Sequence, residues 1–317
     1  MMTSLNERAA ALCQQMIADA ERMRVEVSRC TSGATLINCG INGAGGLAAG
    51  RAMAEICLAG HGEVTLHPGS DSDGSQMLVS VTTDHPVAAC MASQYAGWQI
   101  SVDKYFAMGS GPMRAAAQKE KLFEQIGWTE SPHVAVGVLE AGKLPPAAVC
   151  EKIAGDCGVA SEKLTLLVAP TASIAGSVQV VARSVETALH KMHEIGFDLT
   201  TIKSGYGAAP LPPVAADDLT GIARTNDAVL YGGSVSLWVE CEDELIERLG
   251  PQIPSSASRD FGRPFAEIFA AYDRDFYKVD PHLFSTAQVE LANLRSGRRF
   301  HFGQRRTDIL RQSFLSD

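Results

Sequence analysis

The stretch KLTLLVAPTASIAGSVQVVARSVETALHKMHEIG, residues 163–196, decides the fold class. Its opening LTLLVA is apolar and partly β-branched, which is typical of a buried strand. Pro170 ends the strand. From about Ala175 to His193, apolar residues recur at helical spacing and predict a helix. A buried strand followed by a helix is the repeating unit of α/β proteins.

The same alternation of strands and helices continues on both sides of this stretch. Strands are predicted at 34–40, 63–67, 76–83, 133–141 and 229–240, and helices at 5–27, at 47–58, at 84–96, after Pro145 and at the end of the chain. Segments 63–83 and 229–240 are compatible with antiparallel pairing. The pattern therefore predicts two α/β domains with mixed sheets. The segment 205–213 is dense in Gly and Pro and predicts a loop.

Domain borders are weakly marked in the sequence. We expect an N-terminal domain over 1–125 and a second domain over 126–294. The tail of about 295–317 contains RRFHFGQ and a final helix, and we expect it to pack back onto the first domain.

Composition excludes several classes of partner. The chain has 317 residues and a formal net charge of −9, which argues against a nucleic-acid partner and an anionic membrane surface. The N-terminus MMTSLNERAA lacks the apolar core of a signal peptide. The eight cysteines lie mostly in apolar segments without a CxxC pair, so we expect reduced thiols and a cytoplasmic location.

A Gly-rich turn, GAGGLA at 43–48, follows one predicted strand and opens a helix. It fits the G-x-G-x-x-G/A dinucleotide fingerprint, and Glu63 lies about 20 residues further on, where a ribose-binding acid is expected. Such turns also allow close packing of a helix on a sheet. The turn supports an alternative function, an NAD(P)-dependent oxidoreductase that uses Gly43–Ala48.

A second turn, GSGPMRAAAQKEK at 109–121, begins a helix at Pro112. Its backbone N–H groups, with Ser110, Arg114 and Lys119, are suited to an anionic or polar heteroaromatic ligand. A capped surface helix with solvated charges explains the pattern equally well.

The predicted helix after Pro170 carries a charged pair. Arg183 and Glu186 are three residues apart and share one face. The pair is either an ordinary surface pair or, beside a cleft, a carboxylate kept ionised by a guanidinium. His190 and His193 on the same helix lack nearby Cys or carboxylate ligands of suitable spacing, so we expect no metal.

Longer segments carry a family resemblance. SQYAGWQISV at 93–102, FAMGSGPMRA at 106–115, residues 169–198, IARTNDAVLYGG at 222–233, residues 260–285 and NLRSGRRFHFG at 293–303 together resemble the methenyltetrahydromethanopterin cyclohydrolases. The similarity covers most of the chain, in order and without large gaps.

The resemblance implies a hydrolase of one-carbon metabolism in methanogenic archaea and methylotrophic bacteria. It implies interconversion of the methenyl form of tetrahydromethanopterin, or of its dephospho form, with the 5-formyl form. It further implies a homo-oligomer, a trimer in archaeal members, with the pterin in a cleft between two domains and no metal or redox cofactor. A pterin- or nucleotide-binding protein without turnover is the non-enzymatic alternative.

The family's functional residues fall on named positions of this chain. The resemblance places catalysis on Glu186 and Arg183, within ARSVET. We assign six further residues to substrate binding: Gln94, Tyr95, Ser110, Arg114, Lys119 and Glu120.

Overall fold

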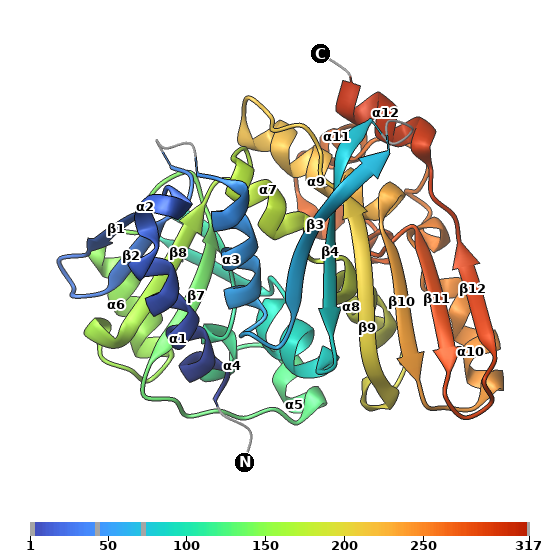
Figure 1. Cartoon of the computed structure of the whole chain (residues 1–317), viewed down its shortest axis with the longest axis horizontal. Coiled ribbons are helices and arrows are strands. Elements are labelled where there is room, and N and C mark those ends of the chain that lie inside the picture. The colour runs from blue at the N-terminus through green and yellow to red at the C-terminus, as the bar shows by residue number, and fades with distance from the viewer. Residues whose placement is uncertain (1–3, 42–44, 71–73, 316–317) are drawn as a thin grey trace. The chain divides into compact units, whose positions relative to one another are not determined.

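The computed structural model describes residues 4–41, 45–70 and 74–315, apart from the side chain of Tyr277. It divides the chain into two compact units, Met1–Gly62 with Val87–Gln179, and Glu63–Pro86 with Val180–Asp317. Each unit is an α/β structure built on one six-stranded mixed sheet (Figure 1), which confirms the predicted fold class. The ligand cleft expected between two domains stays a prediction.

This division differs from the expected borders near 125 and 294. The hairpin of β3 (Glu63–Ser70) and β4 (Ser75–Thr83) belongs to the second unit, because β4 pairs with β9 (Ile202–Pro210). The tail belongs to the second unit too. There β12 (Arg299–Gly303) pairs with β11 (Gln288–Asn293), and α12 (Thr307–Leu315) packs on α9 (Asp218–Gly232). Pairing between distant strands sets the border, and local composition does not mark it.

The first unit has the strand order β1-β2-β8-β7-β6-β5. The strands are β1 (Glu26–Arg29), β2 (Thr35–Asn38), β5 (Trp98–Val102), β6 (Tyr105–Ser110), β7 (Ala135–Glu140) and β8 (Leu164–Ala169). The central strands β2, β8 and β7 are parallel, and the outer pairings are antiparallel. The helices are α1 (Leu5–Ala18), α2 (Ala20–Met23), α3 (Leu47–Cys57), α4 (Met113–Ala117), α5 (Leu122–Ile126), α6 (Ala147–Asp156) and α7 (Ile174–Val181), with a π-helix over Val87–Gln94.

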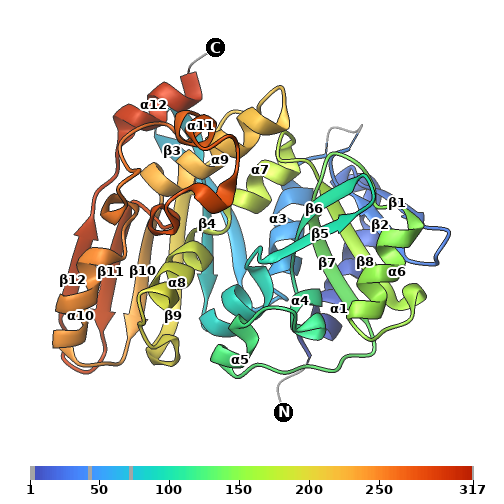
Figure 2. The same ribbon diagram turned by 180° about the vertical axis from the view of Figure 1, so that it is seen from behind.

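Alternating side chains of the parallel strands build a hydrophobic core on each face of this sheet. Leu36 and Leu166 join a core with α4 and α6, while their neighbours Ile37 and Leu167 join a core with α1 and α3. Figures 1 and 2 show the two helical layers on opposite faces of the sheet. A strand that is buried on both faces has an almost continuous run of apolar residues, so these strands could be predicted from the sequence.

The second unit has the strand order β12-β11-β10-β9-β4-β3, with β10 over Ser234–Val239. Its remaining helices are α8 (Ser184–Glu194), α10 (Asp243–Leu249) and α11 (Phe265–Ala271). Helix α8 packs on β4, β9 and β10, and α9 packs on β9. Within the described part of this unit, the helices gather on one face of the sheet and leave the other uncovered (Figures 1 and 2).

Four predicted elements are wrong in detail. The helix expected over 5–27 ends earlier, because β1 begins at Glu26. The helix expected from Ala175 to His193 is two helices, α7 and α8, interrupted after Val181. The expected loop at 205–213 is mostly strand β9, and the first part of the strand expected at 229–240 is the end of α9. In each case burial against a neighbouring element overrides the local signal.

Two other expectations concern the cellular compartment of the protein. All eight cysteines are free, and seven of them are buried, as the sequence suggested. Among the described helices, none combines the length and the apolar character that a membrane crossing requires. The cytoplasmic location stays a prediction.

Candidate active site

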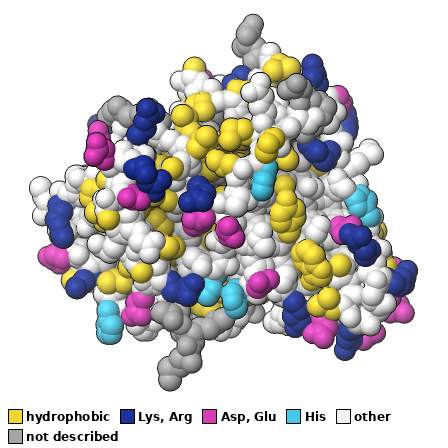
Figure 3. Space-filling model, viewed as in Figure 1, with side chains coloured by type: hydrophobic (Ala, Val, Ile, Leu, Met, Phe, Trp, Pro, Cys, Tyr) yellow, Lys and Arg dark blue, Asp and Glu magenta, His cyan; other side chains and the backbone are white. Residues whose placement is uncertain are grey.

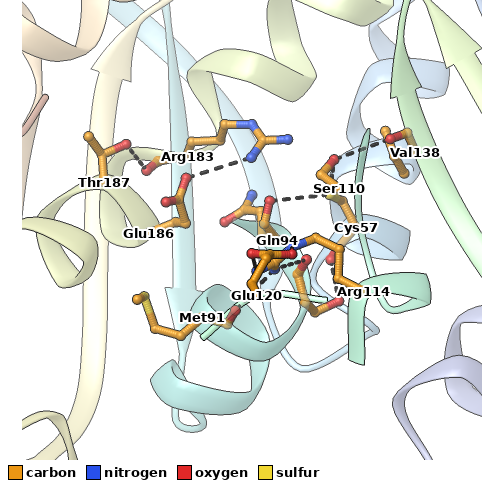
Figure 4. Close-up of polar contacts among 11 residues, drawn as sticks. Cys57, Met91, Gln94, Ser110, Arg114, Glu120, Val138, Arg183, Glu186 and Thr187 are labelled. Carbon is orange, nitrogen blue, oxygen red and sulfur yellow. Dashed lines mark hydrogen bonds and ion pairs between the residues drawn. The ribbon is translucent and has the colours of Figure 1, made fainter. Parts of the chain in front are cut away.

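In the second unit, the start of α8 holds the predicted catalytic pair. Arg183 is the residue before the helix, and Glu186 lies in its first turn. Arg183 Nη1 and Glu186 Oε2 are 3.6 Å apart, and the side chains are only 10% and 7% exposed. Figure 4 shows the guanidinium and the carboxylate facing each other. The pair is therefore not an ordinary surface pair.

The start of helix α8 and the Arg183 guanidinium both favour a negative charge on Glu186. The first turn of a helix carries unpaired N–H groups and a partial positive charge, which stabilises a carboxylate there. The Arg183 guanidinium adds a full positive charge on the same side of Glu186. The 3.6 Å separation is longer than a hydrogen bond. The Arg183 guanidinium therefore attracts the Glu186 carboxylate across this separation.

Two glycines of β9 bring this turn of α8 onto the sheet. A side chain at Gly207 would clash with Ser184 and would lie 2.9 Å from Val185 Cγ2. A side chain at Gly205 would lie 2.9 Å from Val185 Cγ1. These residues immediately precede Glu186. The Gly density that predicted a loop instead gives a strand on which the helix lies closely.

We expect Gly207→Ala to displace the first turn of α8. Overpacking of this kind costs about 1–3 kcal/mol of folding stability, and a shift of about 1 Å at a reacting group lowers turnover by as much as about 10²-fold. Thermal unfolding and turnover should therefore both fall. Gly155→Ala is the matched control, because an added Cβ there meets nothing within 4 Å. Equal behaviour of the two variants would contradict this role for Gly207.

In the first unit, Arg114 and Glu120 form a second ion pair, in which Arg114 is the buried partner. Arg114 is fully buried, and its Nε and Nη2 donate to the two oxygens of Glu120 at 2.9 and 2.5 Å. Its Nη1 donates to the carbonyls of Met91 and Ser93 in the π-helix, both at 3.1 Å. A planar fork of this type holds a carboxylate in one orientation. Arg114, predicted to bind substrate, is fully buried and donates both of these hydrogen bonds to Glu120.

Aromatic rings and a glycine complete this cluster. The Arg114 guanidinium lies 5.0 Å from the centre of the Tyr95 ring and 5.3 Å from that of Phe123. A side chain at Gly97 would clash with the Glu120 carboxylate and the Tyr95 ring. Glu120 stays 16% exposed. A rigid, partly accessible carboxylate beside an aromatic ring is suited to the N–H groups of a flat heteroaromatic ligand.

The remaining predicted binding residues have other partners in the first unit. Ser110 Oγ lies 3.4 Å from the carbonyl oxygen of Val138 and 3.4 Å from Cys57 Sγ. Gln94 is buried at the end of the π-helix. Lys119 forms an ion pair with Asp156 at 2.6 Å and is not part of the Arg114 cluster. The structure thus unites Tyr95, Arg114 and Glu120, and it places Arg183 and Glu186 in the other unit.

The π-helix is the feature that the sequence did not reveal. The helix expected over 84–96 is present, but Val87–Gln94 has the wider π turn. Such turns are rare and occur often at functional sites. Here the carbonyls of Met91 and Ser93 meet Arg114. No residue pattern marks a π-helix, so only the backbone reveals it.

The predicted dinucleotide turn falls partly outside the described residues, since Gly43 and Ala44 are not among them. At Gly45 the backbone has a φ of +53°, and an added Cβ would clash with the Cys39 carbonyl. At Gly50 a side chain would meet Val178 of α7 at 2.7 Å. These contacts support close packing.

Glu63 also lies in the wrong place for the fingerprint. It begins β3, in the second sheet, whereas a ribose-binding acid follows the next strand of the same sheet. The structure gives no support to the oxidoreductase alternative.

The histidines of α8 were the candidate metal ligands in the sequence. His190 Nε2 lies 3.8 Å from Glu194 Oε1. Among the described residues, no group of three or more His, Cys, Asp or Glu side chains is arranged to hold a metal ion. Independence from metal stays a prediction.

The fold and its side chains define an α/β protein of two units, each of which holds an arginine–carboxylate ion pair that is largely shielded from solvent. The chain belongs to the cyclohydrolase (MCH) family, whose model matches residues 4–314. This confirms the resemblance noted from the sequence.

Relatives from bacteria and archaea share nearly the full length, and each is named methenyltetrahydromethanopterin cyclohydrolase. A protein of Methylobacillus flagellatus is 47% identical over 311 residues, which cover 98% of this chain and 95% of the relative. One of Rhodopirellula baltica is 49% identical over 288 residues, covering 89% and 86%. One of Methanosarcina mazei is 44% identical over 317 residues, covering 99% and 98%.

Proposed function

We propose that this chain hydrolyses the methenyl bridge of 5,10-methenyltetrahydromethanopterin, or of its dephospho form, reversibly to the 5-formyl form. Family membership along residues 4–314 supports the reaction. The observation that carries the catalytic assignment is the buried Arg183–Glu186 pair at the start of α8.

Glu186 is the proposed general base and acid. The N5=C–N10 group of the substrate is a cation and already an electrophile. Water adds to its carbon and loses a proton to Glu186, which gives a carbinolamine. The C–N10 bond then breaks as Glu186 returns the proton to N10, and the carbinolamine hydroxyl releases its own proton to solvent as it becomes the formyl carbonyl. General acid–base assistance of this kind typically contributes about 10²–10⁴-fold.

Arg183 orients the carboxylate, and the charge of Glu186 favours the cationic substrate. Preorganised charges in a water-poor site act more strongly than charges in bulk water. The 3.6 Å separation allows Arg183 to orient Glu186 and still leaves Glu186 basic enough to accept a proton. A shorter ion pair would make Glu186 a weaker base, because a close guanidinium stabilises the ionised carboxylate. We expect the contact to change when substrate binds.

Substrate binding is proposed for the first-unit cluster. The Glu120 carboxylate accepts hydrogen bonds from N–H groups of the pterin, and the Tyr95 ring offers an apolar face. Arg114 acts through Glu120. Ser110, Gln94 and Lys119 are proposed to contribute further polar groups, and no metal or redox cofactor takes part in the proposed reaction.

The test is hydrolysis of the purified methenyl pterin by protein dialysed against chelators. We expect the methenyl absorbance to disappear without added metal or nicotinamide, because the electrophile is already cationic. A change in a nicotinamide band instead would support the oxidoreductase alternative. Binding without any absorbance change would indicate a pterin-binding protein. Recovery of activity only with added Zn²⁺ would contradict metal independence.

We further propose that the chain forms a homo-oligomer, a trimer by family resemblance. The uncovered sheet face of the second unit exposes Tyr206 and Trp238, at 40% and 37%, on neighbouring strands. Figure 3, viewed as Figure 1, shows exposed hydrophobic side chains over this part of the molecule. Exposed aromatic residues of this kind mark interaction surfaces.

Sedimentation velocity should give the mass of a trimer for the wild type. Trp238→Glu combined with Tyr206→Glu should lower it, because the added charges oppose burial. Phe106→Glu is the control, at a residue that is 53% exposed on β6 of the first unit's sheet. An unchanged mass for the double variant would exclude this face as the interface.

A further inference from the structure

A buried asparagine near the start of α1 joins distant segments of the first unit. The side chain of Asn6 is fully buried. Its Nδ2 donates to the Pro112 carbonyl at 2.8 Å and to Glu130 Oε1 at 3.0 Å, and its Oδ1 accepts from the Val136 N–H at 2.9 Å. A carbonyl and a carboxylate thus face the amide nitrogen, and an N–H faces the amide oxygen. This network admits one orientation of the amide.

The place of this amide in the sheet explains why it is needed. Strands β6 and β7 pair up to the end of β6. Two residues further in the same antiparallel register, Pro112 would lie opposite Val136. The chain turns instead at Gly111, which has a φ of +88°. The Asn6 amide bridges the Pro112 carbonyl and the Val136 N–H, so it continues the link between the two segments beyond the end of their pairing.

The Pro112 carbonyl belongs to the turn from which α4 begins. Pro112 caps this helix, and its carbonyl also accepts from the Ala115 N–H at 3.0 Å. The N–H of the preceding Gly111 donates to the Ser93 carbonyl of the π-helix at 2.9 Å. The turn is therefore held by the π-helix through Gly111 and by α1 through Asn6.

Apolar packing joins the same segments. Leu5, the neighbour of Asn6, is fully buried in an apolar cluster that includes Ala115 of α4 and Phe123 of α5. The Phe123 ring in turn lies 5.3 Å from the Arg114 guanidinium. The start of α1 thus supports the surroundings of Arg114 through hydrogen bonds and through apolar contacts.

We propose that Asn6 is a positioning residue for substrate binding, because it fixes the turn that places Arg114 and, through Arg114, the Glu120 carboxylate. The inference rests on the proposed function, in which Glu120 accepts hydrogen bonds from the pterin. Arg114 reaches Glu120 from a helix of five residues that begins at this turn. Such a short helix has little stability of its own, so its position depends on the contacts around it.

The second unit contains an asparagine with the same hydrogen-bonding pattern. Asn293, at the end of β11, is 2% exposed. Its Nδ2 donates to the Cys241 carbonyl at 2.9 Å and to Asp243 Oδ1 at 2.6 Å, and its Oδ1 accepts from the Arg295 N–H at 3.1 Å. These three partners lie outside the Arg114 cluster. Asn293→Ala is therefore a matched control for the loss of folding stability.

Steady-state hydrolysis of the methenyl pterin by Asn6→Ala and Asn293→Ala separates positioning from stability. Both variants should unfold at a lower temperature than the wild type, because each loses buried hydrogen bonds. Well below both unfolding midpoints, Asn6→Ala should raise KM about 3- to 10-fold, the size of one weakened hydrogen bond, with kcat nearly unchanged. Asn293→Ala should keep the wild-type KM. A wild-type KM in Asn6→Ala would overturn the proposal, as would an equal rise in both variants.

A double variant tests the route through Glu120. Glu120→Ala should raise KM, and adding Asn6→Ala should raise it little further, because no carboxylate remains to be positioned. Independent, multiplying effects on KM would contradict this route. Where Asn6→Ala does not fold, the smaller truncation Asn6→Ser replaces it in both measurements. Absence of hydrolysis by the wild type would contradict the proposed function itself, whereas wild-type hydrolysis with an unchanged KM in the Asn6 variant contradicts only this role of Asn6.

Discussion

Glu186→Gln should lower the turnover of the methenyl pterin by about 10²–10⁴-fold, the usual contribution of a general base. Glutamine has nearly the same volume, so it fits the site where the Glu186 side chain is 7% exposed. It cannot take the proton from water. Thermal stability should fall only slightly, because a carboxylate in the first turn of a helix contributes about 0.3–1 kcal/mol.

Steady-state hydrolysis and equilibrium binding of the substrate together test this expectation. Binding should persist in Glu186→Gln while turnover is lost. The control is Glu194→Gln, at the other end of the same helix, where the side chain is 50% exposed. Turnover close to wild type in Glu186→Gln would remove Glu186 from the catalytic role.

Arg183→Lys should lower turnover by at least about tenfold, a rise in barrier of about 1.4 kcal/mol. Lysine keeps the positive charge but lacks the planar guanidinium that orients a carboxylate. The Arg183 side chain is 10% exposed, so solvent cannot replace its contacts. Thermal stability should change little, because the charge beside the carboxylate remains.

The chain contains a matched control for this substitution. Arg22 and Asp19 have the same spacing and a shorter contact of 2.6 Å, but their side chains are 62% and 52% exposed. Exposed pairs contribute about 0–1 kcal/mol, so Arg22→Lys should leave turnover and stability unchanged. Measured kcat and KM should separate the two variants. An Arg183→Lys enzyme as active as wild type would reduce Arg183 to a charge-balancing residue.

Some of the candidate site could be predicted from the sequence. Residues three apart in a helix share one face, so the spacing of Arg183 and Glu186 predicted that their side chains are neighbours. Pro112 also marks the start of α4 correctly, since it caps that helix in the structure. Burial of these residues could not be predicted, because it depends on segments far away in the chain.

Other parts depend entirely on long-range packing. The pairing of Arg114 with Glu120 requires the π-helix carbonyls and the absence of a side chain at Gly97. This pairing produces no periodicity in the sequence.

The sequence by itself determined the α/β class, most strands of the central sheets, the buried free thiols and the family. It did so because burial on one face or both imposes an apolar pattern along each segment. Only the tertiary structure decided that β3 and β4 join the second unit, that Gly205 and Gly207 lie in a strand under α8, and that Arg114 is buried. The physical reason is that strand pairing and close packing are contacts between distant segments, and local preferences do not specify their partners.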